Sequence, residues 1–332
     1  MTMEKYLITH FDIHGREPIL RRMKDGTLVC SFLTGGVHEP RNENVFTIAR
    51  SFDDGRTWTK PEVIHKHSWR GLWCTEIFTE CENPFAVIHS YNAPSHYREL
   101  QTFRSFPDES GEKWSEPESI RGTINGCSIR QGFRLSNGDI LFPLYWQEVP
   151  CGFDWPDKPN GWNTQLWPFV TGVGISTDDC KTIYRYGDLR CEGRPLWEPN
   201  AFELEDGHII MYMRAGNPVM YISESFDYGR TWSEPVPSDI PNPNTKITTV
   251  KINGQIVMIN NFCSGSAARL NLCIAKSTDG KHFEKVAQVE PENEEWFYPH
   301  AYVDHEQKIL YVAYENKVDH YLKKYTFEEL GL

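Results

Sequence analysis

One eight-residue motif occurs twice in this chain and strongly restricts how it can fold. Ser-Phe-Asp-x-Gly-Arg-Thr-Trp covers residues 51–58 and again residues 225–232. Weaker copies cover residues 105–114, 176–183 and 277–283. The Asp can accept N–H groups within its own turn, the Gly supplies a positive φ, and the Trp can pack as an apolar plug between strands. The motif therefore predicts a structural turn, and no catalytic role is expected for Asp53 or Asp227.

A second pattern alternates with these motifs. Six segments combine turn residues with a short apolar run: residues 25–32, 82–91, 137–145, 206–214, 253–261 and 306–314. Four begin with Asp-Gly or Asn-Gly, a strong hairpin signal because both residues tolerate positive φ. The runs are too short for typical helices and predict strands buried on both faces, or nearly so. Six units of about 50 residues favour a six-bladed β-propeller of four-stranded blades, which forms a single all-β domain over residues 1–332.

The net charge limits the classes of partner that this protein can bind. The net charge of -12 argues against nucleic-acid and anionic-membrane partners, but it permits a small anionic substrate. The sequence contains no run of about 18 apolar residues, so no membrane-spanning helix is expected.

The nine cysteines form no CxxC pair, so we expect reduced structural thiols, with no metal and no cofactor. The first residues lack a signal-peptide pattern, which favours a cytoplasmic protein unless a leader was removed. Residues 147–169 are rich in Pro, Gly and Trp and predict a long loop over the site.

The repeats resemble the Asp boxes of the sialidase (neuraminidase) superfamily, whose members are six-bladed propellers, and the resemblance covers nearly the whole chain. It implies a glycoside hydrolase that cleaves a terminal acidic sugar with retention of configuration. Five of the family's site positions have counterparts here, in the family's order. They are Arg16 in "GREPIL" (with Glu17 where Ile is usual), Glu198 in "LWEPN", Arg214 after "DGHIIMYM", Arg269 in "SAARLNL" and Tyr298 in "FYPHAYV".

The resemblance implies a role for each of these residues. Arg16, Arg214 and Arg269 would bind the substrate carboxylate, because guanidinium groups form bidentate, charge-assisted bonds. Tyr298 would be the nucleophile, and Glu198 would take its proton; sialidases are the tyrosine exception among glycosidases. Taken singly, each residue has a simpler explanation as a surface, rim or loop side chain. Their occurrence together, at equivalent positions of different blades, favours a site.

The acidic residue of the family differs. The family places its acid/base Asp in the loop before the first box, and here that loop, residues 34–46, contains no Asp. Glu39 is the first candidate replacement and Glu43 the second, with His38 beside them; Glu43 and His38 are also candidate substrate-binding residues. Near the position that contacts the N-acyl group in the family, the closest acid is Glu76. These departures predict an altered substrate, such as a modified sialic acid, another ulosonic acid or a uronic-acid sugar.

Two alternatives remain open. The propeller could carry different chemistry, such as that of a polysaccharide lyase or another exo-glycosidase, and the relevant side chains would then include His10, His14, His38 and His300. Alternatively, it could bind an acidic sugar without cleaving it. In each case the expected partner is a carbohydrate.

Overall fold

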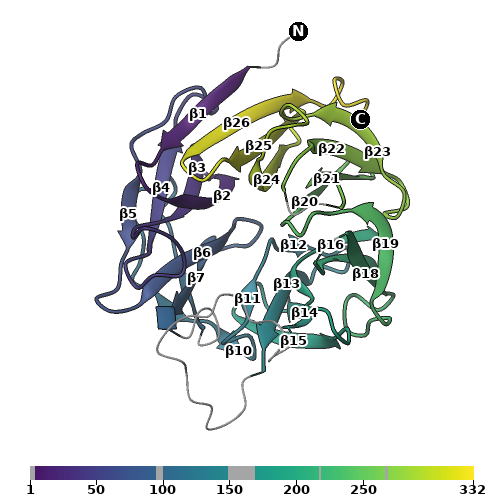
Figure 1. The fold of residues 1–332 in the computed structure, drawn as a ribbon. Helices are drawn as coiled ribbons and strands as arrows, with labels where there is room; N and C mark the ends of the chain where they lie inside the picture. Colours follow the sequence, from purple (N-terminus) through teal and green to yellow (C-terminus); the bar gives the residue numbers. More distant parts are fainter. Residues whose placement is uncertain (1–3, 95–99, 149–168, 217, 266–267) are drawn as a thin grey trace.

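Six sheets, antiparallel except for one short parallel pair, form a ring around a central axis in the computed structural model (Figure 1). The structure describes residues 4–94, 100–148, 169–216, 218–265 and 268–332. No helix long and apolar enough to cross a membrane occurs in these ranges. The arrangement confirms the predicted six-bladed, all-β propeller.

In four of the blades the strands follow chain order from the inner edge, at the centre of the ring, to the outer edge. Blade I contains β2 (Gly15–Arg22), β3 (Leu28–Thr34), β4 (Val45–Ser51) and β5 (Glu62–His65). Blade II contains β6 (Gly71–Phe78), β7 (Phe85–Tyr91), β8 (Gln101–Ser105) and β9 (Glu118–Ser119). Blade III departs from four strands, because its inner strand is divided and a short strand pairs with its outer edge. It contains β10 (Arg121–Gly122), β11 (Ser128–Ile129), β12 (Phe133–Arg134), β13 (Ile140–Gln147), β14 (Phe169–Ser176) and β15 (Thr182–Leu189).

The second half of the ring is more regular. Blade IV contains β16 (Trp197–Glu205), β17 (His208–Arg214), β18 (Val219–Ser225) and β19 (Val236–Pro241). Blade V contains β20 (Thr248–Ile252), β21 (Gln255–Asn261), β22 (Leu272–Ser277) and β23 (Glu284–Gln288). Blade VI contains β24 (Phe297–Asp304), β25 (Ile309–Glu315), β26 (Asp319–Thr326) and β1 (Lys5–His10).

The ring closes through its first strand. β1 pairs antiparallel with β26, with Lys5 opposite Lys323 and His10 opposite Asp319, so the start of the described chain completes the last blade. In Figure 1 the purple β1 lies beside the yellow β26.

The six apolar runs all become the second strand of a blade. These strands, β3, β7, β13, β17, β21 and β25, are buried along nearly their whole length. The prediction of strands buried on both faces is therefore confirmed. The physical reason is that each of these strands lies inside its sheet, with a neighbouring blade packed against either face.

Buried apolar side chains form one cluster at each of the six interfaces between adjacent blades. The last residue of every box packs into one of these clusters. Each packs between its own blade and the preceding one: Trp58, Trp114, Ile183, Trp232 and Phe283. The predicted apolar plug is thus present, and it joins blades as well as strands.

The box aspartates are used within their own turns. Asp227 Oδ1 accepts hydrogen bonds from the backbone N–H groups of Arg230 and Thr231, at 3.0 and 2.8 Å. Asp53 accepts the equivalent bond from Thr57 at 2.8 Å. In the degenerate third-blade box, Cys180 has a φ of 64°, at the position where Gly55 and Gly229 of the complete boxes have φ values of 82° and 85°. The box is therefore a brace, as its sequence predicts.

Candidate active site

A cavity of about 450 Å³ opens where the inner strands begin. We call it the arginine cavity. Its lining combines charged and aromatic side chains: Arg16, Glu17, Glu39, Trp73, Tyr145, Phe169, Trp197, Glu198, Arg214, Asn244, Arg269 and Tyr298. Six residues of the sequence-predicted set are among them, namely Arg16, Glu39, Glu198, Arg214, Arg269 and Tyr298. The structure therefore brings together residues from blades I, IV, V and VI that are far apart in the chain.

Three blades place a side chain in this cavity through the same local device. Glu17, Glu198 and Tyr298 each precede a proline and have a positive φ, of 49°, 43° and 46°. At each of them the pairing with the second strand shifts register, as in a β-bulge. Positive φ in such a residue costs of order 1–3 kcal/mol, and bulges commonly redirect side chains beside active sites. These three strained residues therefore meet at the cavity.

Two guanidinium groups contact the ring of Tyr298. The Cζ atoms of Arg16 and Arg269 lie 4.6 and 5.0 Å from the ring centroid. Arg214, the third arginine, lies 4.9 Å from the ring of Trp197 and donates a hydrogen bond from Nε to Asn244 Oδ1 at 2.7 Å. Two of the cations thus border the candidate nucleophile directly.

The three arginines differ in how far their charge is compensated. Arg16 Nε forms ion pairs with Glu315 at 3.3 Å and with Glu39 at 3.7 Å. Arg214 pairs with Glu198 at 2.6 Å. Within the described residues Arg269 has no carboxylate within 4.0 Å of its guanidinium, and its buried Nη1 has no hydrogen-bond partner. The charge of Arg269 does act on the buried Glu315. A buried donor without an acceptor is costly, however, and a bound anion would remove that cost.

Glu198 is held as a carboxylate between two arginines. Burial alone would raise its pKa, but Arg214 at 2.6 Å and Arg130 at 3.4 Å outweigh that effect and lower the pKa to about 2. Lys246 acts in the same direction. In the ligand-free site Glu198 is consequently ionised and a weak base.

Of the other predicted residues, only Glu39 lies in the arginine cavity; Glu43, Glu76 and His38 lie outside its lining. Glu39 lines the cavity beside Arg16. Glu43 and His38 do not line it: Glu43 forms an exposed ion pair with Arg41 at 3.4 Å, and the exposed His38 contacts the carbonyl of Glu39 at 3.2 Å. Glu76 does not line the cavity either, because it is fully buried and paired with Arg21 at 2.7 Å. Burial raises the pKa of Glu76 to about 7, against the effect of Arg21.

The alternative histidines lie at separate places. His10 is exposed and pairs with Asp319 at 2.7 Å. Burial and the nearby Arg16 lower the pKa of His14 to about 4. His300 is buried on the inner strand of blade VI, with Nε2 at 3.1 Å from Arg21 Nη1. The structure does not gather these histidines into one site, and in the described ranges no three His, Cys, Asp or Glu side chains form a metal-binding group.

Several lining residues carried no usable sequence signal. Trp73, Tyr145 and Phe169 come from blades II and III, whose first residues match no motif. Arg130, which contacts Glu17 and Glu198, follows the two-residue strand β11. The predicted loop over residues 147–169 can be compared only at its ends, since residues 149–168 lie outside the described ranges. Gln147 and Phe169 are paired strand residues, so those two ends of the loop prediction are wrong.

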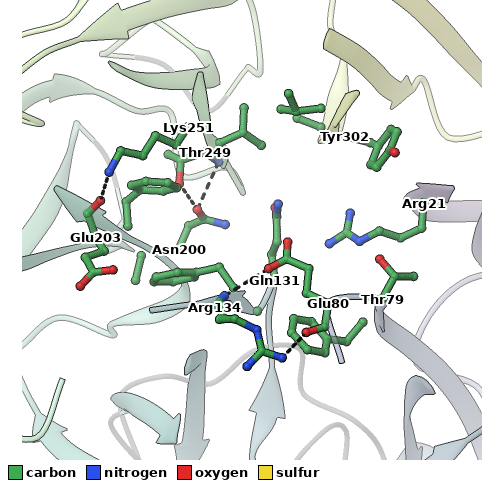
Figure 2. A pocket seen from close by; sticks show the side chains of 18 of the residues that line it. Arg21, Thr79, Glu80, Gln131, Arg134, Asn200, Glu203, Thr249, Lys251 and Tyr302 are labelled. Carbon is green, nitrogen blue, oxygen red and sulfur yellow. Dashed lines mark hydrogen bonds between the residues drawn. The ribbon is translucent and has the colours of Figure 1, made fainter. Parts of the chain in front are cut away.

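A second cavity, of about 360 Å³, is lined by later residues of the same inner strands (Figure 2). Its charged groups are already bound to protein atoms. Lys251 Nζ donates to the carbonyl of Glu203 at 3.1 Å, and Arg134 donates to the carbonyl of Glu80 at 2.6 Å. The arginine cavity, where Arg269 lacks a partner, is the stronger candidate for ligand binding.

Fold and cavity together define the class of a sialidase-like propeller. A family model described as "BNR repeat-like domain" matches residues 26–311. The chain therefore belongs to the BNR repeat-like family, as a divergent, sialidase-like member. Sequence comparison with curated proteins returned no significant match.

Solved structures agree on the fold. A Hadza microbial sialidase, Hz136, matches with a TM-score of 0.74 and 15% identity over 95% of this chain and 66% of its own. A Dyadobacter fermentans protein of unknown function matches with a TM-score of 0.74 and 14% identity over 97% of each chain. Trypanosoma rangeli sialidase matches with a TM-score of 0.67 and 18% identity over 96% of this chain, but over only 56% of its own. At these identities the likeness concerns the fold.

Proposed function

We propose that this protein is a retaining exo-glycosidase that removes a terminal acidic sugar. The observation that carries the proposal is the arginine cavity, in which three guanidinium groups gather near Tyr298 and one of them, Arg269, has a buried donor without a partner. A sugar carboxylate bound by Arg16, Arg214 and Arg269 would supply the missing acceptor with charge-assisted bonds. The strained backbone at Glu198 and Tyr298 supports the same location.

The mechanism begins with the competition for Arg214. When the substrate carboxylate binds Arg214, it weakens the ion pair that lowers the pKa of Glu198. Glu198 then becomes a stronger base and accepts the phenolic proton as Tyr298 attacks the anomeric carbon. Glu39 gives its proton to the leaving oxygen, and water later hydrolyses the glycosyl-tyrosine bond with Glu39 as the base. Two inversions at the anomeric carbon give net retention.

The direct test is trapping with a 2,3-difluorinated sugar acid, followed by mass spectrometry of peptides. Trypanosoma rangeli sialidase has been described with 2,3-difluorosialic acid as a covalent intermediate. We expect the label on Tyr298 in the wild type and no label in Tyr298→Phe. The proposal is wrong if the enzyme hydrolyses an acidic glycoside while the label never appears on Tyr298.

The substrate class needs a separate measurement. A panel of aryl glycosides of sialic acids, other ulosonic acids, uronic acids and neutral sugars should show cleavage confined to acidic sugars. Cleavage of neutral sugars alone would contradict the proposal. A product with new near-ultraviolet absorbance would indicate a lyase instead.

A further inference from the structure

The cavity contains a third side chain placed by the same bulge as Glu198 and Tyr298, and the mechanism leaves it unused. Glu17 occupies the corresponding position on β2, with a φ of 49°, a following proline and a register shift between Arg16 and Ile19. Its side chain is 4% exposed and lines the arginine cavity. A strained backbone that directs a carboxylate into a binding cavity indicates a functional position.

The contacts of Glu17 divide unequally between its two oxygens. Oε2 accepts hydrogen bonds from Trp73 Nε1 and Arg130 Nη1, both at 3.1 Å. Oε1 has only a longer contact with Arg130, at 3.4 Å. A carboxylate can accept about four hydrogen bonds, so Oε1 retains capacity for a donor from a ligand.

The partners of Glu17 indicate which role it can have. Its ion pair with Arg130 involves two buried side chains, 4% and 3% exposed. Both oxygens accept from Arg130 Nη1, and Oε2 also accepts from Trp73. A carboxyl group whose oxygens already serve as acceptors is suited to accept a further hydrogen bond from a ligand hydroxyl.

The ring places Glu17 between the predicted carboxylate-binding groups and blades II and III. Arg16, its neighbour in sequence, lies with it on blade I, whereas its partners Trp73 and Arg130 belong to blades II and III. Arg269 and Tyr298 are on blades V and VI. A sugar whose carboxylate lies against the arginines would therefore have the part of its ring that faces blades II and III within reach of Glu17.

We propose that Glu17 determines specificity by accepting a hydrogen bond from a hydroxyl of the sugar bound in the arginine cavity. This inference rests on the proposed function, because it assumes an acidic sugar in the arginine cavity. A polar group built to bind a hydroxyl rejects the analogue that lacks it, since the buried acceptor is then left unpaired.

Binding tests this inference without requiring turnover. The probes are 2,3-unsaturated sugar acids of the classes in the glycoside panel and their singly deoxygenated analogues, measured by calorimetry. For the wild type, removal of one particular hydroxyl should weaken binding about 10- to 100-fold, the range for a hydrogen bond to a charged group. In Glu17→Leu the same removal should change the dissociation constant less than about 3-fold.

A matched control keeps the carboxylate but removes one of its donors. Trp73→Phe deletes the Nε1 contact to Glu17 and should retain the hydroxyl preference. If Glu17→Leu fails to fold because Arg130 is left unpaired, the double variant Glu17→Leu/Arg130→Met removes both charges and replaces it in the test.

The outcomes separate the two proposals. Binding with no cleavage contradicts the glycosidase proposal and still tests Glu17. Binding with equal hydroxyl preference in the wild type and in Glu17→Leu overturns the role of Glu17 alone. If no acidic sugar binds the wild type, both proposals are wrong.

Discussion

At the scale of single residues, we expect Arg269 to contribute more to ligand affinity than to stability. Its Nη1 is buried without a hydrogen-bond partner within the described residues. Arg269→Met should therefore leave the free energy of unfolding unchanged or raise it, because a buried donor that lacks an acceptor is removed. Affinity for an acidic ligand should fall about 10- to 100-fold.

Urea unfolding and calorimetric titration with a 2,3-unsaturated sugar acid would measure the two quantities. Arg121→Met, an equal charge change at an exposed position of β10, is the control and should alter neither. A large loss of stability in Arg269→Met would show that the guanidinium has a structural role.

The environment of His320 predicts how the stability of the protein depends on pH. His320 is fully buried against the rings of Phe11 and Phe32. Burial lowers its pKa from 6.5 to about 3. The unfolded chain therefore takes up the proton first, and the stability due to the neutral ring is complete above pH 6.5 and declines as the pH falls toward 3.

His320→Phe should remove this dependence, since Phe fits the aromatic surroundings and does not titrate. Unfolding free energies in urea at pH 7, 6, 5 and 4 would check it. The wild type should lose up to about 1.4 kcal/mol per pH unit more than the variant below pH 6.5. Parallel curves for the two proteins would contradict this interpretation.

At the scale of elements, the Asp box joins a turn to an interface between blades. Asp227 accepts bonds from Ser225, Arg230 and Thr231, while Trp232 of the same box packs toward blade III. Asp227→Ala leaves these donors without their acceptor and should lower the free energy of unfolding by about 1–3 kcal/mol. The kcat of the folded enzyme should stay within about 2-fold of the wild type, because the box lies outside the arginine cavity.

Asp227→Asn is the companion variant. It keeps an acceptor oxygen and should recover part of the lost stability. Thermal unfolding and initial rates would measure both effects; a collapse of kcat in a fully folded variant would assign the box a role that we do not expect.

The strands and boxes could be predicted from sequence because their signals are local. An Asn-Gly or Asp-Gly turn and a short apolar run specify a hairpin without reference to the rest of the chain, as at Asn137 and Asp206. The residues of the candidate site could be predicted from the sequence only in part. Glu198 and Tyr298 directly precede prolines and Arg16 lies two residues before one, in recognisable segments. Arg130 and Trp73, in contrast, contact Glu17 through the closure of the ring, which no local pattern encodes.

At the scale of the whole molecule, the ring depends on the strand that closes it. Ile8 of β1 is 4% exposed and packs with Leu20 of blade I and Leu322 of blade VI. Ile8→Ala should lower the free energy of unfolding by about 2–5 kcal/mol, the range for deleting a buried aliphatic side chain.

Tryptophan fluorescence and far-ultraviolet circular dichroism should report one coincident unfolding transition, with its midpoint at a lower urea concentration than in the wild type. Leu7→Ala is the exposed neighbour and should have a small effect, and separated transitions would indicate that blade VI unfolds alone.

The pairing of β1 with β26 also affects how the protein folds while it is being synthesised. Lys5 and Lys323 are partners across almost the full described chain, so the first strand emerges from the ribosome long before its neighbour exists. At a synthesis rate of about 5–20 residues per second, that delay is roughly 20–60 s. During this interval the growing protein has unpaired strand edges at both ends of an open arc. Slow translation would therefore favour contacts between newly made copies, and the ring becomes self-contained only when β26 is released.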